Sequence, residues 1–170
     1  VICQYLRNAH SLVRVHRTDG NLLREVGLPG IGRARGFSGH GDDPETFYSY
    51  TDFTTPTAIY RYSVASGEGA LFARSEPEID LTGYQTEQVF YESKDGTRVP
   101  MFIVHRTGLV RDGTNPTLLY GYGGFNISQT PAFSVTRLAW MDLGGVYAVS
   151  NIRGGGEYGK AWHQAGTRLN

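Results

Sequence analysis

The sequence predicts a chain of two parts, an all-β first half followed by an α/β second half. In the first half, short alternating or β-branched segments are separated by turn residues and show little helical periodicity. In the second half, a hairpin and a strand precede a run with helical spacing and an almost continuously apolar strand. Proline and acidic residues at positions 75–80 interrupt the strand pattern, as in a linker. We therefore expect one domain over residues 1–76 and a second over residues 77–170.

Two hairpins of similar pattern make up most of the first half. They cover residues 10–26 and 57–74, and each reverses at a glycine-containing turn. The hairpins superpose with a shift of about 47 residues, which pairs Val13 with Tyr60, and a strand-like run precedes each. Such a period is typical of β-propeller blades, and two unrelated surface hairpins are the alternative. Fewer than two units are present and a propeller needs at least about four blades, so we expect the last blades of a longer propeller.

The second half begins with a hairpin over residues 86–105 that turns at a Gly-containing loop. A strand follows at residues 117–120. Residues 134–143 then have apolar positions near helical spacing and end before Gly144, which is a plausible helix stop. The run 145–150 is nearly all apolar, as expected of a strand covered on both faces of an α/β sheet. Hairpin, strand, helix and buried strand in this order predict the N-terminal part of an α/β-hydrolase domain.

The stretch 120–126, Tyr-Gly-Tyr-Gly-Gly-Phe-Asn, places two tyrosines and three glycines at the end of the predicted strand. Glycine allows unusual backbone angles and close approach to a ligand, and tyrosine supplies a donor that stays protonated at neutral pH. Donors fixed where negative charge will develop are what an oxyanion hole needs. The residue types alone favour the alternative, a glycine-rich turn packed by tyrosines.

Composition excludes several classes of function. Lys and Arg balance Asp and Glu to a formal net charge of zero, without runs of like charge, so we expect no nucleic-acid partner. No apolar stretch approaches the ~20 residues of a membrane span, and no signal-peptide pattern is present. The single cysteine cannot form an internal disulfide and no Cys/His cluster has zinc-ligand spacing, so we expect no metal. The chain opens on a strand-like run without Met, and we expect an internal piece of a larger protein.

Two glycine-rich motifs lie in the second half. One is the stretch 120–128; the other is Asn-Ile-Arg-Gly-Gly-Gly-Glu-Tyr-Gly at 151–159, followed by Trp162 and His163. Together they resemble the prolyl oligopeptidase (prolyl endopeptidase) family of serine peptidases. They lie about thirty residues apart with the predicted helix and buried strand between them. Similarity extends back through the hairpin and into the first half. The resemblance implies a seven-bladed β-propeller over an α/β-hydrolase domain, of which this chain would hold the last blades and the first part of the hydrolase.

The resemblance also implies roles for individual residues. Tyr122 would stabilise the tetrahedral oxyanion with its phenol, and Phe125 would line the hydrophobic substrate pocket. Tyr120, the last residue of an apolar strand, is expected in the core. Arg153 and Glu157 are expected to brace the glycine loop rather than to touch substrate.

The nucleophile is missing from the sequence. An α/β-hydrolase serine sits in a Gly-x-Ser-x-Gly-like elbow, and its acid and histidine follow later in the chain. The nearest imitation surrounds Ser38 in the β-rich half and lacks the second glycine, and His163 is not the triad histidine of the family. We therefore expect none of the triad residues here, and no hydrolysis by this chain alone.

The whole protein is interpreted as a serine endopeptidase that cleaves short peptides on the carboxyl side of proline through an acyl-enzyme. The resemblance implies a monomer with short proline-containing peptides as partners and without metal or cofactor. The compartment is not given; we favour cytoplasm over periplasm. One alternative is an oligopeptidase B-like enzyme that cleaves after basic residues, although Gly-Gly-Phe-Asn at 123–126 fits the prolyl branch better. The other is a non-enzymatic β-rich binding module.

Overall fold

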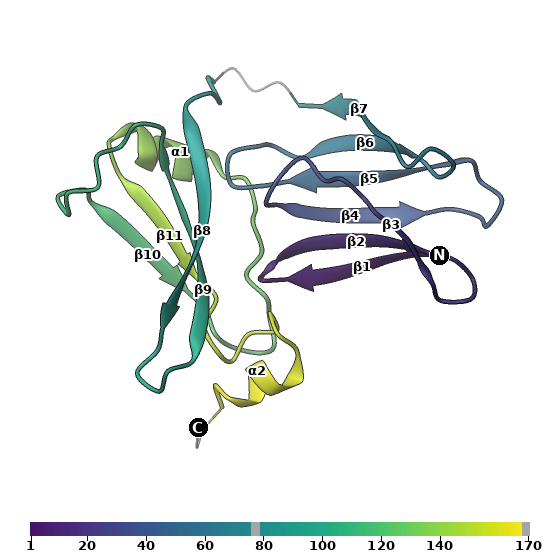
Figure 1. Cartoon of the computed structure of the whole chain (residues 1–170). Helices are drawn as coiled ribbons and strands as arrows, with labels where there is room; N and C mark the ends of the chain where they lie inside the picture. The colour runs from purple at the N-terminus through teal and green to yellow at the C-terminus, as the bar shows by residue number, and fades with distance from the viewer. Residues whose placement is uncertain (76–78, 168–170) are drawn as a thin grey trace. The chain divides into compact units, whose positions relative to one another are not determined.

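The chain forms two compact units in a computed structural model that describes residues 1–75 and 79–167 (Figure 1). The first unit comprises residues 1–80 and 131–133, and the second comprises residues 81–130 and 134–170. The domain boundary expected between residues 76 and 77 lies outside the described residues and stays a prediction.

Two antiparallel sheets form the first unit. The three-stranded sheet contains β1 (Ile2–Arg7), β2 (His10–His16) and β3 (Leu22–Glu25). The four-stranded sheet contains β4 (Arg33–Ser38), β5 (Glu45–Thr51), β6 (Ala58–Ser63) and β7 (Gly69–Arg74). The two predicted hairpins are β2–β3 and β6–β7, both antiparallel. The second hairpin follows the first at the predicted shift, so the two sheets repeat one structural unit, as propeller blades do.

The core of the first unit lies between these two sheets. Residues of both sheets, together with Val26 directly after β3, meet in one buried cluster of Val13, Val15, Val26, Ala34, Tyr48, Tyr50 and Tyr62. Ser11 on β2 fixes the contact, because its backbone N donates to the Gly32 carbonyl oxygen at 2.9 Å and its Oγ accepts from the Ala34 N at 2.9 Å. Gly32 is required by close packing, since a Cβ at this position would collide with the Tyr50 ring.

Stacked aromatic rings fill much of this core. The Tyr48 ring stacks on Phe37 with centroids 4.6 Å apart and on Tyr60 at 5.3 Å. Phe37 reaches this position through a bulge in β4, where its φ of 60° leaves the extended range. Burial raises the pKa of Tyr48 to about 12, so its phenol stays protonated.

A single four-stranded sheet and two helices form the second unit. The strands are β8 (Tyr84–Glu92), β9 (Arg98–Arg106), β10 (Thr117–Gly121) and β11 (Val146–Ser150), in the order β10-β11-β9-β8. The helices are α1 (Val135–Asp142) and α2 (Lys160–Gln164). Only the β10–β11 pair is parallel among the described strands. The predicted hairpin, helix and last strand are all confirmed, and all five residues of β11 are buried.

Helix α1 packs against β9 and β11 through its buried residues Leu138 and Met141. The indole Nε1 of Trp140 donates to the Val146 carbonyl oxygen at 2.9 Å and so fixes the start of β11 to the helix. The helix ends before Gly144, as predicted, and the φ of 85° at this glycine suits a left-handed stop. Neither of the two described helices has the length and apolar character of a bilayer span.

The expectation that Tyr120 lies in the core is wrong. Its side chain is 41% exposed, and Leu118 and Leu119 are more exposed still. The physical reason is the place of β10 at the sheet edge, where the described residues leave both faces of the strand open. An apolar run indicates a strand, but it does not say how much of the strand is covered.

We expect Tyr62→Phe to stabilise the first unit and Tyr50→Phe to destabilise it. Both rings are fully buried, but the Tyr50 hydroxyl donates to Asp52 Oδ2 at 3.1 Å, whereas the Tyr62 hydroxyl has no partner among residues 1–75 and 79–167. Removing an unsatisfied buried hydroxyl should raise the free energy of unfolding by about 1 kcal/mol, and removing a hydrogen bond to a carboxylate should lower it by about 1.5–3 kcal/mol. Urea denaturation of the protein measures both; equal losses in the two variants would contradict the assignment.

Candidate active site

Two glycine-rich loops lie side by side because they follow neighbouring parallel strands. The first glycine loop, residues 122–129, leaves β10, and the second glycine loop, residues 151–159, leaves β11. Gly121 pairs with Ser150 at the end of the ladder, so both loops start at the same edge of the sheet. The carboxyl ends of parallel strands are where α/β sheets bind ligands.

The first glycine loop has an unusual backbone. Gly123, Phe125 and Asn126 all have positive φ, at 59°, 54° and 57°. The left-handed conformation costs most residues other than glycine roughly 1–2 kcal/mol, so Phe125 holds strain, whereas asparagine adopts this conformation more readily. A turn closed by the Ile127 N, which donates to the Gly124 carbonyl oxygen at 3.0 Å, turns Phe125 outward until 83% of it is exposed.

Tyr122 and Phe125, the two predicted site residues, are neighbours at the outer surface of this loop. Their rings are 6.4 Å apart between centroids and tilted by 36°, and Tyr122 is 44% exposed. The Tyr122 hydroxyl makes no hydrogen bond to any described residue and is therefore available as a donor. Phe125 borders a hollow of about 560 Å³, whose other lining residues are Gly123, Gly124, Gly154, His163, Gly166 and Thr167.

The second glycine loop packs directly on the first. A Cβ on Gly154 would collide with the carbonyl oxygen of Gly123, and a Cβ on Gly123 would lie 2.5 Å from Ile152 Cγ1. The Asn126 N donates to the Gly154 carbonyl oxygen at 3.2 Å. Nδ1 of His163 lies 2.6 Å from the same oxygen and 3.2 Å from the Asn126 N. His163 therefore supports the loop contact.

A buried polar pair holds the far end of the first glycine loop. Asn151 is fully buried and Glu157 is 3% exposed. Oε1 of Glu157 accepts from the Gln129 N at 2.8 Å and from Asn151 Nδ2 at 3.2 Å, while Nδ2 also donates to the Gln129 carbonyl oxygen at 2.7 Å. Glu157 braces the glycine loop, as predicted. The sequence gives Asn151 no role of its own, although an amide side chain directly after a buried strand signals a buried polar contact.

Arg153 braces a different segment from the one expected. Its guanidinium forms an ion pair with Asp95 and donates to Ser93 Oγ at 3.2 Å and to Thr97 Oγ1 at 3.3 Å. These residues form the turn between β8 and β9, so Arg153 ties the second glycine loop to the hairpin instead of to the first loop. The guanidinium holds the pKa of Asp95 well below its usual range.

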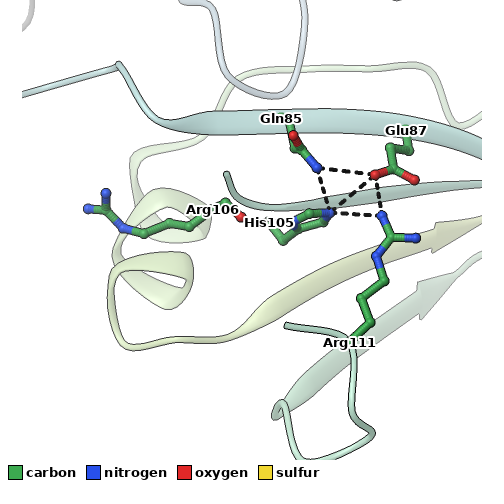
Figure 2. A network of polar contacts seen from close by, with 5 residues as sticks. All are labelled: Gln85, Glu87, His105, Arg106 and Arg111. Atoms are coloured by element: carbon green, nitrogen blue, oxygen red, sulfur yellow. Dashed lines mark hydrogen bonds and ion pairs between the residues drawn. The ribbon is translucent and has the colours of Figure 1, made fainter. Parts of the chain in front are cut away.

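A separate polar network surrounds His105 on the sheet formed by β8 and β9 (Figure 2). His105 is 2% exposed, and its Nδ1 lies 2.7 Å from the Arg106 carbonyl oxygen, so Nδ1 carries the proton. Nε2 then accepts from Gln85 Nε2 and Arg111 Nη2, each at 3.2 Å. Arg111 also forms an ion pair with Glu87, which lowers the pKa of that carboxyl. Every polar atom of the imidazole is thus satisfied, and the network is structural.

The described residues contain no serine in the setting of a hydrolase nucleophile. Ser38 ends β4 in the first unit, and its carbonyl oxygen accepts from Thr46 Oγ1 at 2.8 Å, so the residue continues an antiparallel sheet and begins no helix. Residues 1–75 and 79–167 also hold no group of three or more His, Cys, Asp or Glu placed to bind a metal. The site geometry supplies a hydrogen-bond donor and an apolar surface.

Two family models match the chain. "Prolyl oligopeptidase, N-terminal beta-propeller domain" matches residues 1–75, and "Prolyl oligopeptidase family" matches residues 131–170. A prolyl endopeptidase of Elizabethkingia miricola is 49% identical over 164 residues, which are 96% of this chain and 23% of the relative. A prolyl endopeptidase of Dictyostelium discoideum is 38% identical over 98% of this chain and 22% of its own length.

Solved structures agree with the sequence matches. One from a structural and mechanistic analysis of two prolyl endopeptidases superposes with a TM-score of 0.89 at 53% identity, covering 97% of this chain and 24% of that one. Prolyl oligopeptidase B from Galerina marginata, bound to a 35mer hydrolysis and macrocyclization substrate, gives 0.88 at 34% identity, covering 98% and 24%. The chain thus spans about a quarter of the length of these relatives. The predicted fold, the end of a β-propeller followed by the start of an α/β-hydrolase domain, is confirmed.

We expect Gly154→Ala to separate the two glycine loops. The new methyl group would meet the Gly123 carbonyl oxygen, and the φ of 97° is also unfavourable for alanine. Strain of roughly 1–2 kcal/mol and overpacking of about 1–3 kcal/mol should both lower the free energy of unfolding. Gly144→Ala is the matched control, since its φ is 85° but no atom lies within 4 Å of the added Cβ. Urea denaturation should show the larger loss for Gly154→Ala, and equal losses would contradict the close contact.

Proposed function

Because the chain belongs to the prolyl oligopeptidase family, we propose that it supplies one side of the active site of a serine endopeptidase that cleaves short peptides after proline. The reaction would pass through an acyl-enzyme and use no metal. The observation that carries the proposal is the pair of exposed rings of Tyr122 and Phe125 on a loop whose backbone is held by the second glycine loop.

Tyr122 is proposed as an oxyanion donor. Attack on a peptide carbonyl places negative charge on its oxygen, and a phenol that is fixed beforehand stabilises this charge without reorganising. The Tyr122 hydroxyl is suited to the role because no described residue accepts its proton. The pairing of Gly121 with Ser150 and the close packing of Gly123 against Ile152 place the backbone on both sides of Tyr122.

Phe125 is proposed as part of the pocket for the proline side chain. The pyrrolidine ring is compact and apolar, and an exposed aromatic face gives it a surface that a charged residue would not favour. The hollow beside Phe125 is lined mostly by glycine backbone, which leaves room for a substrate chain. An oligopeptidase B-like specificity would instead require carboxylates near this ring.

These 170 residues contain no Gly-x-Ser-x-Gly elbow, so the proposal assigns the nucleophile, acid and histidine to protein outside this chain. On this proposal the 170-residue chain alone hydrolyses nothing, whereas the complete product of its gene is active.

The complete gene product should release chromophore from a peptide with proline before the cleaved bond and not from the matching arginine peptide. The reason is the apolar surface of Phe125. The isolated 170-residue chain, assayed in parallel, should release none from either. Cleavage of the arginine peptide alone would favour an oligopeptidase B-like enzyme, and cleavage of neither by the complete product would favour a non-enzymatic binding module.

Tyr122→Phe in the complete gene product should lower kcat by about 10²–10³, as the loss of one oxyanion donor does. KM should change much less, because the hydroxyl acts on charge that exists only in the transition state. Tyr120→Phe is the control. It removes the same hydroxyl from a tyrosine of strand β10, outside the first glycine loop, and should leave kcat nearly unchanged. Steady-state kinetics on the proline peptide measures both variants. An unchanged kcat in Tyr122→Phe would contradict the oxyanion role and leave Tyr122 as a packing residue.

A further inference from the structure

The buried pair of Asn151 and Glu157 leaves hydrogen-bonding capacity unused. Asn151 Oδ1 and Glu157 Oε2 are both buried and have no partner among the described residues. Buried acceptors without donors cost stability, and a buried carboxylate costs more than a neutral group. A pair kept only for stability would be expected to satisfy these atoms or to be apolar, so the arrangement calls for another role.

The pair forms hydrogen bonds with both the backbone N and the backbone carbonyl oxygen of Gln129, and we call these two bonds the grip on the loop. Glu157 Oε1 accepts from the Gln129 N at 2.8 Å, and Asn151 Nδ2 donates to the Gln129 carbonyl oxygen at 2.7 Å. The bond of 3.2 Å between Nδ2 and Oε1 joins the two side chains. Asn151 is itself anchored through its backbone N, which donates to the Pro100 carbonyl oxygen at 2.9 Å. Gln129 is thereby fixed to the end of the central strand β11.

The first glycine loop is therefore held at three places. Gly121 pairs with Ser150 before the loop, the Asn126 N donates to the Gly154 carbonyl oxygen in its middle, and Gln129 is gripped at its end. Tyr122 lies inside this span, and its hydroxyl has no hydrogen bond to a described residue that could orient it. The position of the loop backbone and the neighbouring Phe125 ring then limit where the phenol can lie.

We propose that Asn151 and Glu157 are positioning residues that set the aim of the Tyr122 hydroxyl through Gln129. The inference rests on the proposed function of Tyr122. It adds that the hydrogen bonds on Gln129 are needed for the Tyr122 hydroxyl to reach the oxyanion in the transition state. Glu157, which accepts one of these bonds, lies 28 residues after Gln129 in the sequence.

The grip uses Glu157 as an acceptor rather than as a charge. Both hydrogen bonds end on Oε1, and Oε2 takes none from the described residues. A glutamine amide offers the same oxygen and puts its NH₂ group at the idle position. Glu157→Gln should therefore preserve the grip, whereas Glu157→Ala removes it.

A double-mutant cycle in the complete gene product tests the inference. Glu157→Ala should lower kcat about 10–100-fold with a smaller change in KM, and Glu157→Gln should stay within about 3-fold of the unmodified protein. In the Glu157→Ala background, the penalty of Tyr122→Phe should shrink by the factor that Glu157→Ala alone costs, about 10–100-fold, because a phenol that no longer points at the oxyanion contributes less to the transition state. A Tyr122→Phe penalty that keeps its full size there would overturn the inference.

Tyr91→Phe is the matched control for the cycle. Tyr91 also shares a hydrogen bond with the end of β11, to Ser150 Oγ at 2.7 Å, but this contact does not involve the first glycine loop. The fold-losses in kcat caused by Tyr91→Phe and by Tyr122→Phe should multiply in the double variant, as expected for independent positions. Should Glu157→Ala fail to fold, Asn151→Leu, which is nearly isosteric and lacks the amide donor, repeats the cycle.

Amide hydrogen exchange separates failure of the inference from failure of the proposed function. Residues 122–129 should exchange faster in Glu157→Ala than in Glu157→Gln, whether or not the protein cleaves peptides. Equal exchange rates of residues 122–129 in the two variants would show that Glu157 does not hold the loop. If the unmodified complete protein cleaves no peptide, the proposed function fails and the aim of Tyr122 fails with it, while faster exchange would still support the grip on the loop.

Discussion

The parallel pairing of β10 with β11 is the constraint on which the candidate site depends. It brings two loops, which are about thirty residues apart in the sequence, to one edge of the sheet, starting from the pair Gly121 and Ser150. Close backbone approach between the loops occurs at Gly154, where an added Cβ would collide with the carbonyl oxygen of Gly123. The pairing of β10 with β11 brings the two loops together, and the glycines allow their backbones to approach closely. The burial of β11 under α1 keeps the pairing in register, since all five of its residues are covered.

The site concentrates energetic costs that the surrounding structure offsets. Phe125 and Asn126 are held in left-handed backbone conformations, and Glu157 is a buried carboxylate with one unused oxygen. Such features persist only where neighbouring contacts over-determine them. Here the contacts are the Asn126 bond to Gly154, the grip on Gln129, and the buried end of β11. The first unit also holds such features, because Asn8, Ala9 and Phe37 have positive φ and the buried Tyr62 hydroxyl has no described partner.

Local patterns predicted the elements well, because their causes are local. Alternation and a glycine-containing turn identify β6–β7, and a helical period ending before Gly144 identifies α1. Contacts between distant residues were not predictable in the same way. The partner of Arg153 is Asp95, 58 residues earlier, and no property of the glycine motif selects that turn. Exposure of Tyr120 also escaped prediction, because it depends on what lies beside β10 rather than on the residues of the strand.

The roles proposed for Tyr122 and Phe125 require both rings to be open to a ligand and also fixed in position, and these two demands conflict for an aromatic residue. Packing Tyr122 and Phe125 into the core would fix them and close them to a ligand. The chain instead leaves both rings exposed and fixes the backbone that carries them, with glycine contacts at the middle of the loop and buried polar groups at its end. Buried contacts thus fix the loop backbone, while the exposed rings remain accessible to a ligand. The unusual part of this division is the burial of Asn151 and Glu157, since polar side chains are mostly exposed in folded proteins.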